Sequence, residues 1–86
     1  MRVATLPLAS IRRPLQRSLD DAKVAALMAS IAADGLREPI EVLEVEGRYW
    51  GFNGCHRVAA HARLGMETIR ARVRRATPRE LRLHML

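Results

Sequence analysis

Apolar and polar residues follow patterns that change along the chain, and these patterns predict its secondary structure. Four apolar residues between positions 20 and 34 fall at the i, i+3, i+4, i+7 spacing of one helix face: Val24, Leu27, Met28 and Ile31. Asp20 or Asp21 can cap the start of this helix, and Gly35 can end it. The pattern therefore predicts a helix that runs to about Asp34.

Strands are predicted where apolar residues alternate or cluster with β-branched and aromatic ones. Two such runs within residues 40–52 flank Glu46-Gly47, which is typical of a hairpin. A short strand is expected at residues 2–6, where Pro7 breaks it, and another at Thr68–Val73.

Two further helices follow from turn and capping signals. Asn53-Gly54 is a tight turn, and the Ala-, Arg- and Leu-rich residues after it predict a helix closed by Gly65. Residues 77–80 (Thr-Pro-Arg-Glu) form a capping box that opens a short C-terminal helix. The order β-α-β-β-α-β-α predicts one α+β (mixed α/β) domain over residues 1–86, with a small mixed sheet packed with helices.

Length and cysteine content narrow the class of protein. Eighty-six residues suffice for one domain. A single cysteine cannot form an internal disulfide, which is typical of a reducing compartment. The first ten residues lack the apolar run of a secretory leader, and no stretch approaches the ~20 apolar residues of a membrane span. We therefore predict a cytoplasmic protein that does not enter the membrane.

Positive charge is concentrated in the last third of the chain. Residues 1–54 carry seven basic and seven acidic side chains, whereas residues 55–86 carry eight arginines and two glutamates. The formal charge of +6 therefore arises entirely from the second segment. This asymmetry favours an anionic partner, either nucleic acid or a phosphorylated small molecule, although a solvated arginine-rich face explains the same pattern.

The clearest chemical signal lies in residues 51–57, where a strand ends, a turn follows and a helix begins at Cys55. The first amides of a helix have no intrahelical partner. Together with the helix dipole they make a phosphate site, which Gly54 lets a ligand approach closely. The same potential, with Arg57 nearby and Arg13 able to reach it from the N-terminal segment, favours a thiolate at Cys55. We interpret Cys55 as a nucleophile; the alternative is a buried small apolar residue.

Lys23 is a second signal, because it is the only lysine among fifteen basic residues and lies in the first turn of the first predicted helix. A cation there opposes the helix dipole at a cost of about 0.3–1 kcal/mol unless an anion offsets it. A bound phosphate would do so. The alternative is a solvated lysine beside Asp20 and Asp21.

Metal binding and Cys–His hydrolysis are poorly supported. Cys55 and His56 are adjacent, His61 and His84 are scattered, and no C-x-x-C spacing occurs. Adjacent side chains usually point apart, and no carboxylate or carboxamide at a recognisable spacing would orient a histidine base. We predict no metal site on the protein and interpret His61 as a partly buried or surface residue.

Residues 52–60 (FNGCHRVAA), followed by residues 67–69 (ETI), resemble the F-[SG]-G-C-H-R signature of the sulfiredoxins. The resemblance extends to residues 12–15 (RRPL) and 20–24 (D-x-x-K-V), so it spans nearly the whole chain. It implies the ParB/sulfiredoxin-like fold. It also implies repair of over-oxidised 2-Cys peroxiredoxins, whose cysteine sulfinic acid is irreversible without such an enzyme.

The chemistry that the resemblance implies uses ATP and Mg2+. A sulfinate is a poor electrophile, because its negative charge repels a thiolate and it has no leaving group. Phosphorylation of its oxygen would supply that leaving group. The Cys55 thiolate could then attack sulfur to give a thiosulfinate, which external thiols would reduce.

The family pattern assigns roles to individual residues. The ATP phosphates would be held by Lys23, Ser30, Gly54, Cys55, His56 and Arg57. Arg13 and Arg57 would stabilise the Cys55 thiolate and the incoming anion, while Asp20 either orients this basic cluster or caps the helix. Magnesium would be held through the phosphates and water, as is usual for this ion.

Two positions depart from the family pattern. Ala26 stands where some members have a serine near the phosphates, and Asn53 replaces the usual Ser or Gly of the turn.

With a single cysteine, the intermediate must be resolved by thioredoxin, glutathione or the peroxiredoxin itself. Tyr49 and Trp50 lie on opposite faces of one strand, so one ring is expected to contact the peroxiredoxin, on which the chain would dock as a monomer.

A ParB-like nucleotide-binding module that acts on DNA is the alternative. Residues 30–40, followed by the hairpin, turn and helix, fit the ParB N-terminal domains, and the basic last third would suit DNA. Three features weigh against it. Cys55 stands where ParB typically carries Glu or His, the sequence ends before a helix-turn-helix could follow, and residues 20–23 match the sulfiredoxin pattern. We therefore predict that nucleic acid is not the partner.

Overall fold

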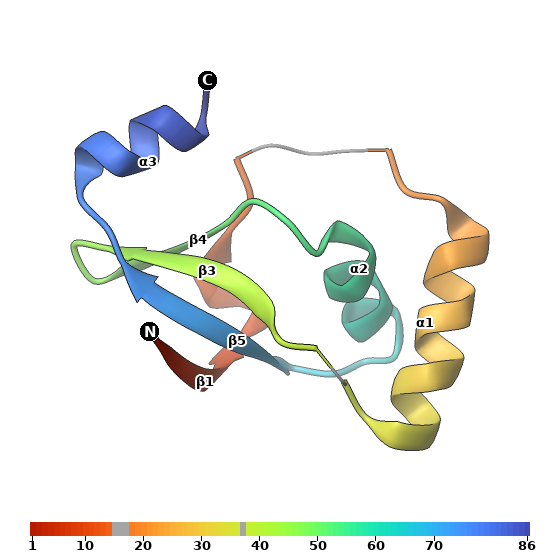
Figure 1. The fold of residues 1–86 in the computed structure, drawn as a ribbon. Coiled ribbons are helices and arrows are strands. Elements are labelled where there is room, and N and C mark those ends of the chain that lie inside the picture. Colours follow the sequence, from red (N-terminus) through yellow and green to blue (C-terminus); the bar gives the residue numbers. More distant parts are fainter. Residues whose placement is uncertain (15–17, 37) are drawn as a thin grey trace.

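The computed structural model describes residues 1–14, 18–36 and 38–86, and its elements follow one another as Figure 1 shows. In chain order these are β1 (Arg2–Pro7), the 3-10 turn η1 (Leu8–Ser10), β2 (Ile11–Arg12), α1 (Asp21–Asp34), β3 (Ile40–Val45), β4 (Arg48–Gly51), α2 (Cys55–Arg63), β5 (Thr68–Arg75) and α3 (Pro78–His84). The predicted order β-α-β-β-α-β-α is confirmed, with η1 and β2 added. Leu15, part of the RRPL motif, lies outside the described residues.

The described strands form one five-stranded mixed sheet in the order β1-β5-β3-β4-β2. β3 and β5 run parallel at its centre, and α2 lies on the connection from β4 to β5. β1 is antiparallel to β5, β4 is antiparallel to β3, and β2 is parallel to β4. The predicted α+β class with a small mixed sheet is therefore confirmed.

Helices lie on both faces of the sheet. Val58 of α2 packs against the larger cluster of the core, which comprises Leu6, Ile11, Ile40, Val42, Ile69, Ala71 and Val73. α1 packs on α2 through Val24, Ile31 and Ala60, so α2 lies between α1 and the sheet (Figure 1). Successive side chains of a strand point to opposite faces of the sheet. Leu43 and Val45 of β3 therefore point away from α2, and Leu81 of α3 packs against them.

The helices α1 and α3 begin, and α1 ends, at the capping residues that the sequence predicts. The Asp20 carboxylate accepts hydrogen bonds from the backbone N–H groups of Ala22 (3.0 Å) and Lys23 (3.3 Å), so Asp20 rather than Asp21 is the N-cap of α1. Gly35 ends that helix with φ of 76°. Thr77 caps α3 by accepting from the Glu80 N–H at 3.1 Å, as the capping box predicts.

The short strand β2 was not predicted. Its two residues pair with Tyr49 and Trp50 of β4, and Ile11 is buried in the core. A two-residue strand carries no periodicity of its own, because its conformation is set by the neighbouring strand. β2 matters for the site, since it fixes the position from which Arg13 begins.

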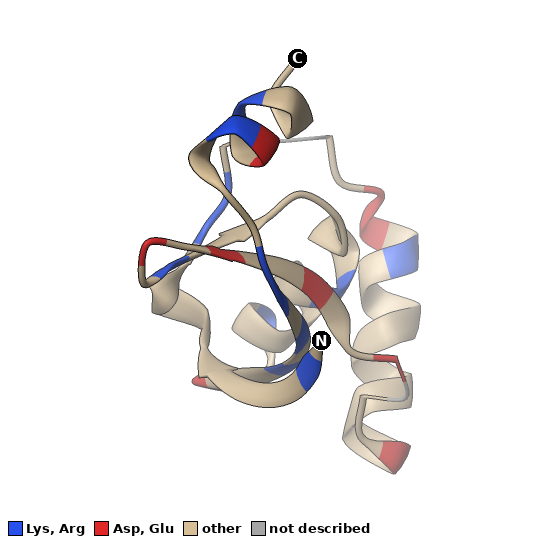
Figure 2. Cartoon of the chain, turned by 60° about the vertical axis from the view of Figure 1, so that its left-hand side comes forward, with Lys and Arg blue, Asp and Glu red and all other residues tan. Residues whose placement is uncertain are grey.

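Many of the basic residues lie on the last strand and the last helix, β5 and α3, where Figure 2 shows them in blue. Two arginines of this region form ion pairs with acidic groups: Arg74 with Glu80 at 2.9 Å and Arg75 with Glu44 at 3.6 Å. In the part of the chain that the structure describes, no helix is long and apolar enough to cross a membrane.

Candidate active site

The turn that carries Cys55 has a backbone conformation that requires glycine. Gly54 adopts φ of 71°, in the left-handed region, and a Cβ there would lie 2.6 Å from the Cγ2 atom of Ile40. The preceding Asn53 accepts a hydrogen bond from the Glu41 N–H on its side-chain oxygen at 3.3 Å. The turn is therefore held against the start of β3.

Cys55 is the first residue of α2 and is partly exposed. The first backbone bond of this helix joins the Val58 N–H to the Gly54 carbonyl at 2.9 Å. The amides of Cys55, His56 and Arg57 therefore precede the intrahelical ladder and are available to an anion, at the positive end of the helix dipole.

Arg13 reaches Cys55 from the segment after β2. Its Nη2 atom donates to the Cys55 sulfur at 2.7 Å, and its Nη1 atom donates to the Asn53 carbonyl at 2.7 Å. A cation that donates to sulfur stabilises the thiolate more than the neutral thiol. Gly51 leaves room for this contact, because a Cβ there would lie 2.7 Å from the Arg13 Nη1 atom.

A cavity of about 360 Å3 opens at the N-terminal end of α2. Its lining consists of Ser18, Leu27, Asn53, Gly54, Cys55, His56 and Arg57. The predicted turn, the thiol and the first helical amides thus face one space. Sequence reasoning missed Ser18, because it belongs to no motif that indicates a ligand. Gly51 begins the stretch that the sequence singled out, but its close approach to Arg13 depends on a residue distant in the chain.

His56 joins the start of α2 to the start of α1. Its Nε2 atom accepts a hydrogen bond from the Asp20 N–H at 3.0 Å, so the ring carries its proton on Nδ1 in this arrangement. The Asp20 carboxylate itself caps α1. Of the two roles considered for Asp20, the structure thus gives its carboxylate the cap, while its backbone N–H orients His56.

Arg57 forms its hydrogen bonds with backbone carbonyls and not with the thiol. Its Nη1 atom donates to the carbonyls of Glu38 (2.9 Å) and Pro39 (3.2 Å), so the hydrogen bond that reaches the Cys55 sulfur comes from Arg13. Arg57 nevertheless lines the Cys55 cavity and a second cavity of about 300 Å3. The two cavities therefore adjoin at Arg57.

Ser30 and Lys23 come from α1. Ser30 lines the second cavity and does not line the cavity of Cys55. Lys23 is exposed in the first turn, and its ammonium forms no ion pair with the residues that the structure describes. Ala26, one turn before Ser30, is also exposed.

His61 is buried, with 3% of its surface exposed, and its Nδ1 atom lies 2.7 Å from the Arg57 carbonyl. The ring is thus a hydrogen-bonded part of α2, and it is more deeply buried than the partly buried or surface position that the sequence predicted. Metal chemistry is not suggested by the described residues, among which no group of three or more His, Cys, Asp or Glu side chains could hold an ion.

Known proteins are similar to this chain in sequence and in fold. The chain is 52% identical over 85 residues to the chloroplastic/mitochondrial sulfiredoxin of Arabidopsis thaliana, covering 96% of this chain and 68% of that protein. The crystal structure of sulfiredoxin from Arabidopsis thaliana matches with a TM-score of 0.97, covering 100% of this chain and 99% of that one at 50% identity. The chain belongs to the sulfiredoxin family. The resemblance found in the sequence is therefore confirmed.

Sulfiredoxins share their fold with ParB. The family model of the ParB N-terminal domain matches residues 1–86, so the chain also belongs to that wider family. The C-terminally truncated ParB from Caulobacter crescentus, complexed with CTP-gamma-S, matches with a TM-score of 0.75 at 24% identity, over 99% of this chain and 51% of that one. At this identity the match indicates the fold alone.

Proposed function

We propose that this sulfiredoxin reduces the cysteine sulfinic acid of over-oxidised 2-Cys peroxiredoxins in an ATP-dependent reaction. The observation that carries the proposal is the 2.7 Å contact between the Arg13 guanidinium and the Cys55 sulfur, at the N-terminus of α2. It places a charged hydrogen-bond donor on the Cys55 sulfur, beside amides that can bind an anion. A thiol nucleophile and an anion site in one cavity suit an anionic sulfur substrate.

The two adjoining cavities fit the parts of ATP. The free amides of α2, with His56 at the same end, suit the phosphates. Lys23 lines neither cavity, but its ammonium forms no ion pair with the described side chains and could turn toward the phosphates. The second cavity is lined by Leu27, Ile31 and Leu36, which suit the less polar nucleoside. Magnesium would be held through the phosphates and water.

ATP, as co-substrate, would supply the phosphoryl group that turns one sulfinate oxygen into a leaving group. The Cys55 thiolate then donates its electron pair to the substrate sulfur, so an S–S bond forms as the S–O bond to phosphate breaks. The product is a thiosulfinate between Cys55 and the substrate cysteine. Arg13 donates a hydrogen bond to the Cys55 sulfur and offers positive charge to the anion that approaches it.

Completion of the reaction needs an external reductant, because the chain has one cysteine. Thioredoxin, glutathione or a second thiol of the peroxiredoxin would attack the thiosulfinate and release Cys55. We propose that the chain meets the peroxiredoxin as a monomer, in the cytoplasm.

The proposal is tested by incubating the protein with an over-oxidised 2-Cys peroxiredoxin, MgATP and excess thiol, and then recording the intact mass of the peroxiredoxin. We expect loss of both sulfinate oxygens, and no loss without ATP or with Cys55→Ser. Cys55→Ser should still bind ATP, because the helix amides remain, but it should not reduce the sulfinate, because a serine hydroxyl is scarcely ionised at neutral pH.

Repair by Cys55→Ser would contradict the assignment of the nucleophile. No mass change with wild-type protein and a peroxiredoxin from the same cell would contradict the proposed activity. DNA binding would then be measured, to test the ParB-like alternative.

A further inference from the structure

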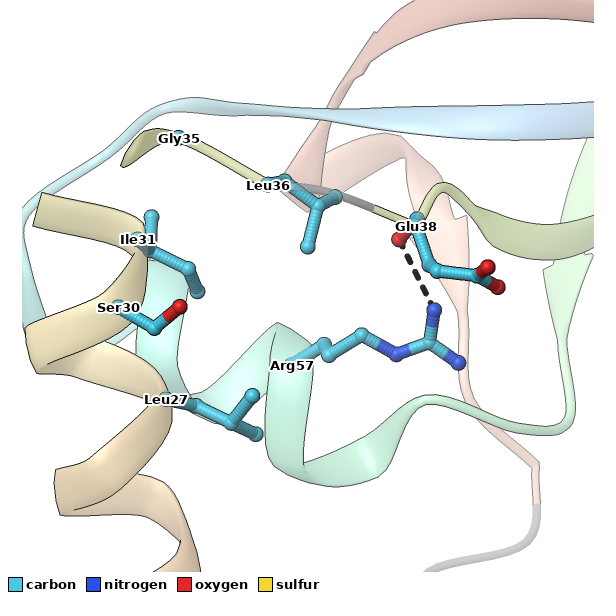
Figure 3. Close-up of a pocket in the computed structure, with 7 residues that line it drawn as sticks. All are labelled: Leu27, Ser30, Ile31, Gly35, Leu36, Glu38 and Arg57. Atoms are coloured by element: carbon cyan, nitrogen blue, oxygen red, sulfur yellow. Dashed lines mark hydrogen bonds between the residues drawn. The ribbon is translucent and has the colours of Figure 1, made fainter. Parts of the chain in front are cut away.

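The second cavity has a wall that belongs to neither helix nor strand. Its lining is drawn in Figure 3 and consists of Leu27, Ser30, Ile31, Gly35, Leu36, Glu38 and Arg57. Gly35, Leu36 and Glu38 lie on the connection between α1 and β3. The shape of the cavity therefore depends on where this connection is held.

Two arginines from other elements bind carbonyl groups of the connection. Arg57, on α2, donates to the carbonyls of Glu38 and Pro39 at 2.9 and 3.2 Å, and Figure 3 shows its side chain running toward Glu38. Arg70, on β5, donates through Nη2 to the Leu36 carbonyl. Hydrogen bonds from a charged donor are stronger than neutral ones, so both contacts can fix the backbone.

Leu36 is the point at which this wall meets the core. Its side chain packs against the sheet cluster and against the cluster between α1 and α2. It also lines the second cavity, beside Leu27 and Ile31. Because Arg70 holds the carbonyl of the same residue, movement there would shift one apolar side of the cavity.

We infer that Arg70 is a positioning residue for the nucleoside end of the ATP site, acting through Leu36. Arg70 lines neither the second cavity nor the cavity of Cys55, so it would have no direct contact with a nucleotide bound there. Its effect therefore falls on the nucleoside part of ATP and spares the phosphates at the start of α2. This inference rests on the proposed function.

The test compares two ligands by isothermal titration calorimetry, MgATP and inorganic tripolyphosphate with Mg2+. In Arg70→Met, the Kd for MgATP should rise about 2- to 30-fold, the range of indirect coupling effects. The Kd for tripolyphosphate should stay within error of wild type, because that ligand has no nucleoside. Leu36→Ala should reproduce the same split between the two ligands.

Arg72→Met is the matched control. Arg72 lies two residues further along β5, on the same face of the strand, and its loss removes the same charge. We expect both affinities to be unchanged in this variant. Thermal unfolding of every variant checks that it is folded at the temperature of the titration.

The outcomes separate the inference from the proposed function. Equal weakening of both ligands in Arg70→Met, an equal effect in Arg72→Met, or no effect on MgATP would overturn the positioning role of Arg70. Failure of wild-type protein to bind MgATP would overturn the proposed function, and the nucleoside assignment with it. Faster amide hydrogen exchange at Leu36 and Glu38 in Arg70→Met, absent from Arg72→Met, would still support the hold on the connection.

Discussion

Gly51 provides the space in which Arg13 reaches Cys55, and Gly54 allows the turn before Cys55 to pack against Ile40. At Gly51 a Cβ would collide with the guanidinium, and at Gly54 it would collide with Ile40. The Arg13 guanidinium donates to the Asn53 carbonyl before Gly54 and to the Cys55 sulfur after it. These two hydrogen bonds fix the guanidinium against the turn. The position of the thiol thus depends on the absence of two side chains.

Gly54→Ala should lower the free energy of unfolding by roughly 1–3 kcal/mol, because alanine is strained at positive φ and its methyl group meets Ile40. Gly47→Ala is the matched control, since Gly47 has φ of 78° and an open position with nothing within 4 Å. Urea unfolding of both variants measures the difference. An equal loss in the two variants would mean that the contact with Ile40 costs nothing.

Arg13→Met should slow alkylation of Cys55 by iodoacetamide on the order of tenfold at neutral pH, because the thiolate loses a charged hydrogen-bond donor. Arg12→Met is the control, since it removes the same charge from the neighbouring residue, whose guanidinium lies over the Trp50 ring. Alkylation is followed by intact mass. Equal rates in the two variants would show that net charge, not the contact, governs the thiol.

At the scale of the elements, α1 begins where a single carboxylate caps two amides. Asp20→Ala should lower the free energy of unfolding by about 0.5–2 kcal/mol through loss of the cap. Asp20→Asn should retain most of the stability, because the amide oxygen can accept the same bonds. Chemical unfolding measures both. A loss in Asp20→Asn as large as in Asp20→Ala would mean that the charge of Asp20, rather than its cap, stabilises the fold.

The helices and their ends could be predicted because their signals are local. The apolar stripe of α1, its cap at Asp20 and its stop at Gly35 all lie within one stretch of sequence. The pairing of β2 with β4 and the hydrogen bond from Arg57 to the Glu38 carbonyl could not be predicted, because each depends on residues distant in the chain. The same limit applies to Arg13. Its charge suggested that it could approach Cys55, but the contact itself depends on the pairing of β2 with β4, which places Arg13.

At the scale of the whole molecule, the two rings of β4 lie on different faces of the sheet. Tyr49 packs against the sheet cluster under α2, whereas Trp50 packs near Leu81 of α3 and lies beneath Arg12. Both rings are partly exposed. We assign Trp50 to the peroxiredoxin contact, since the face of Tyr49 carries α2 and, over it, α1, whereas among the described residues the face of Trp50 carries the short helix α3.

Trp50→Ala should weaken the complex with an over-oxidised peroxiredoxin while MgATP affinity stays unchanged, because the ring lines neither cavity. Loss of an aromatic contact at an interface typically costs at least about 1 kcal/mol, or roughly five- to tenfold in Kd. Biolayer interferometry measures the complex, with Tyr49→Phe as the control. Unchanged affinity for the peroxiredoxin would refute the assignment.

The pairing of β1 with β5 has a consequence for how the molecule is made. The first strand finds its partner only in a strand near the end of the chain, with Arg2 opposite Val73 and Pro7 opposite Thr68. Contacts so far apart in sequence close late and slow folding. During synthesis on the ribosome, Cys55 therefore emerges before the sheet that supports Arg13 is complete. In a nascent chain, the Arg13 guanidinium that donates to the Cys55 sulfur therefore has no completed sheet to hold it in place.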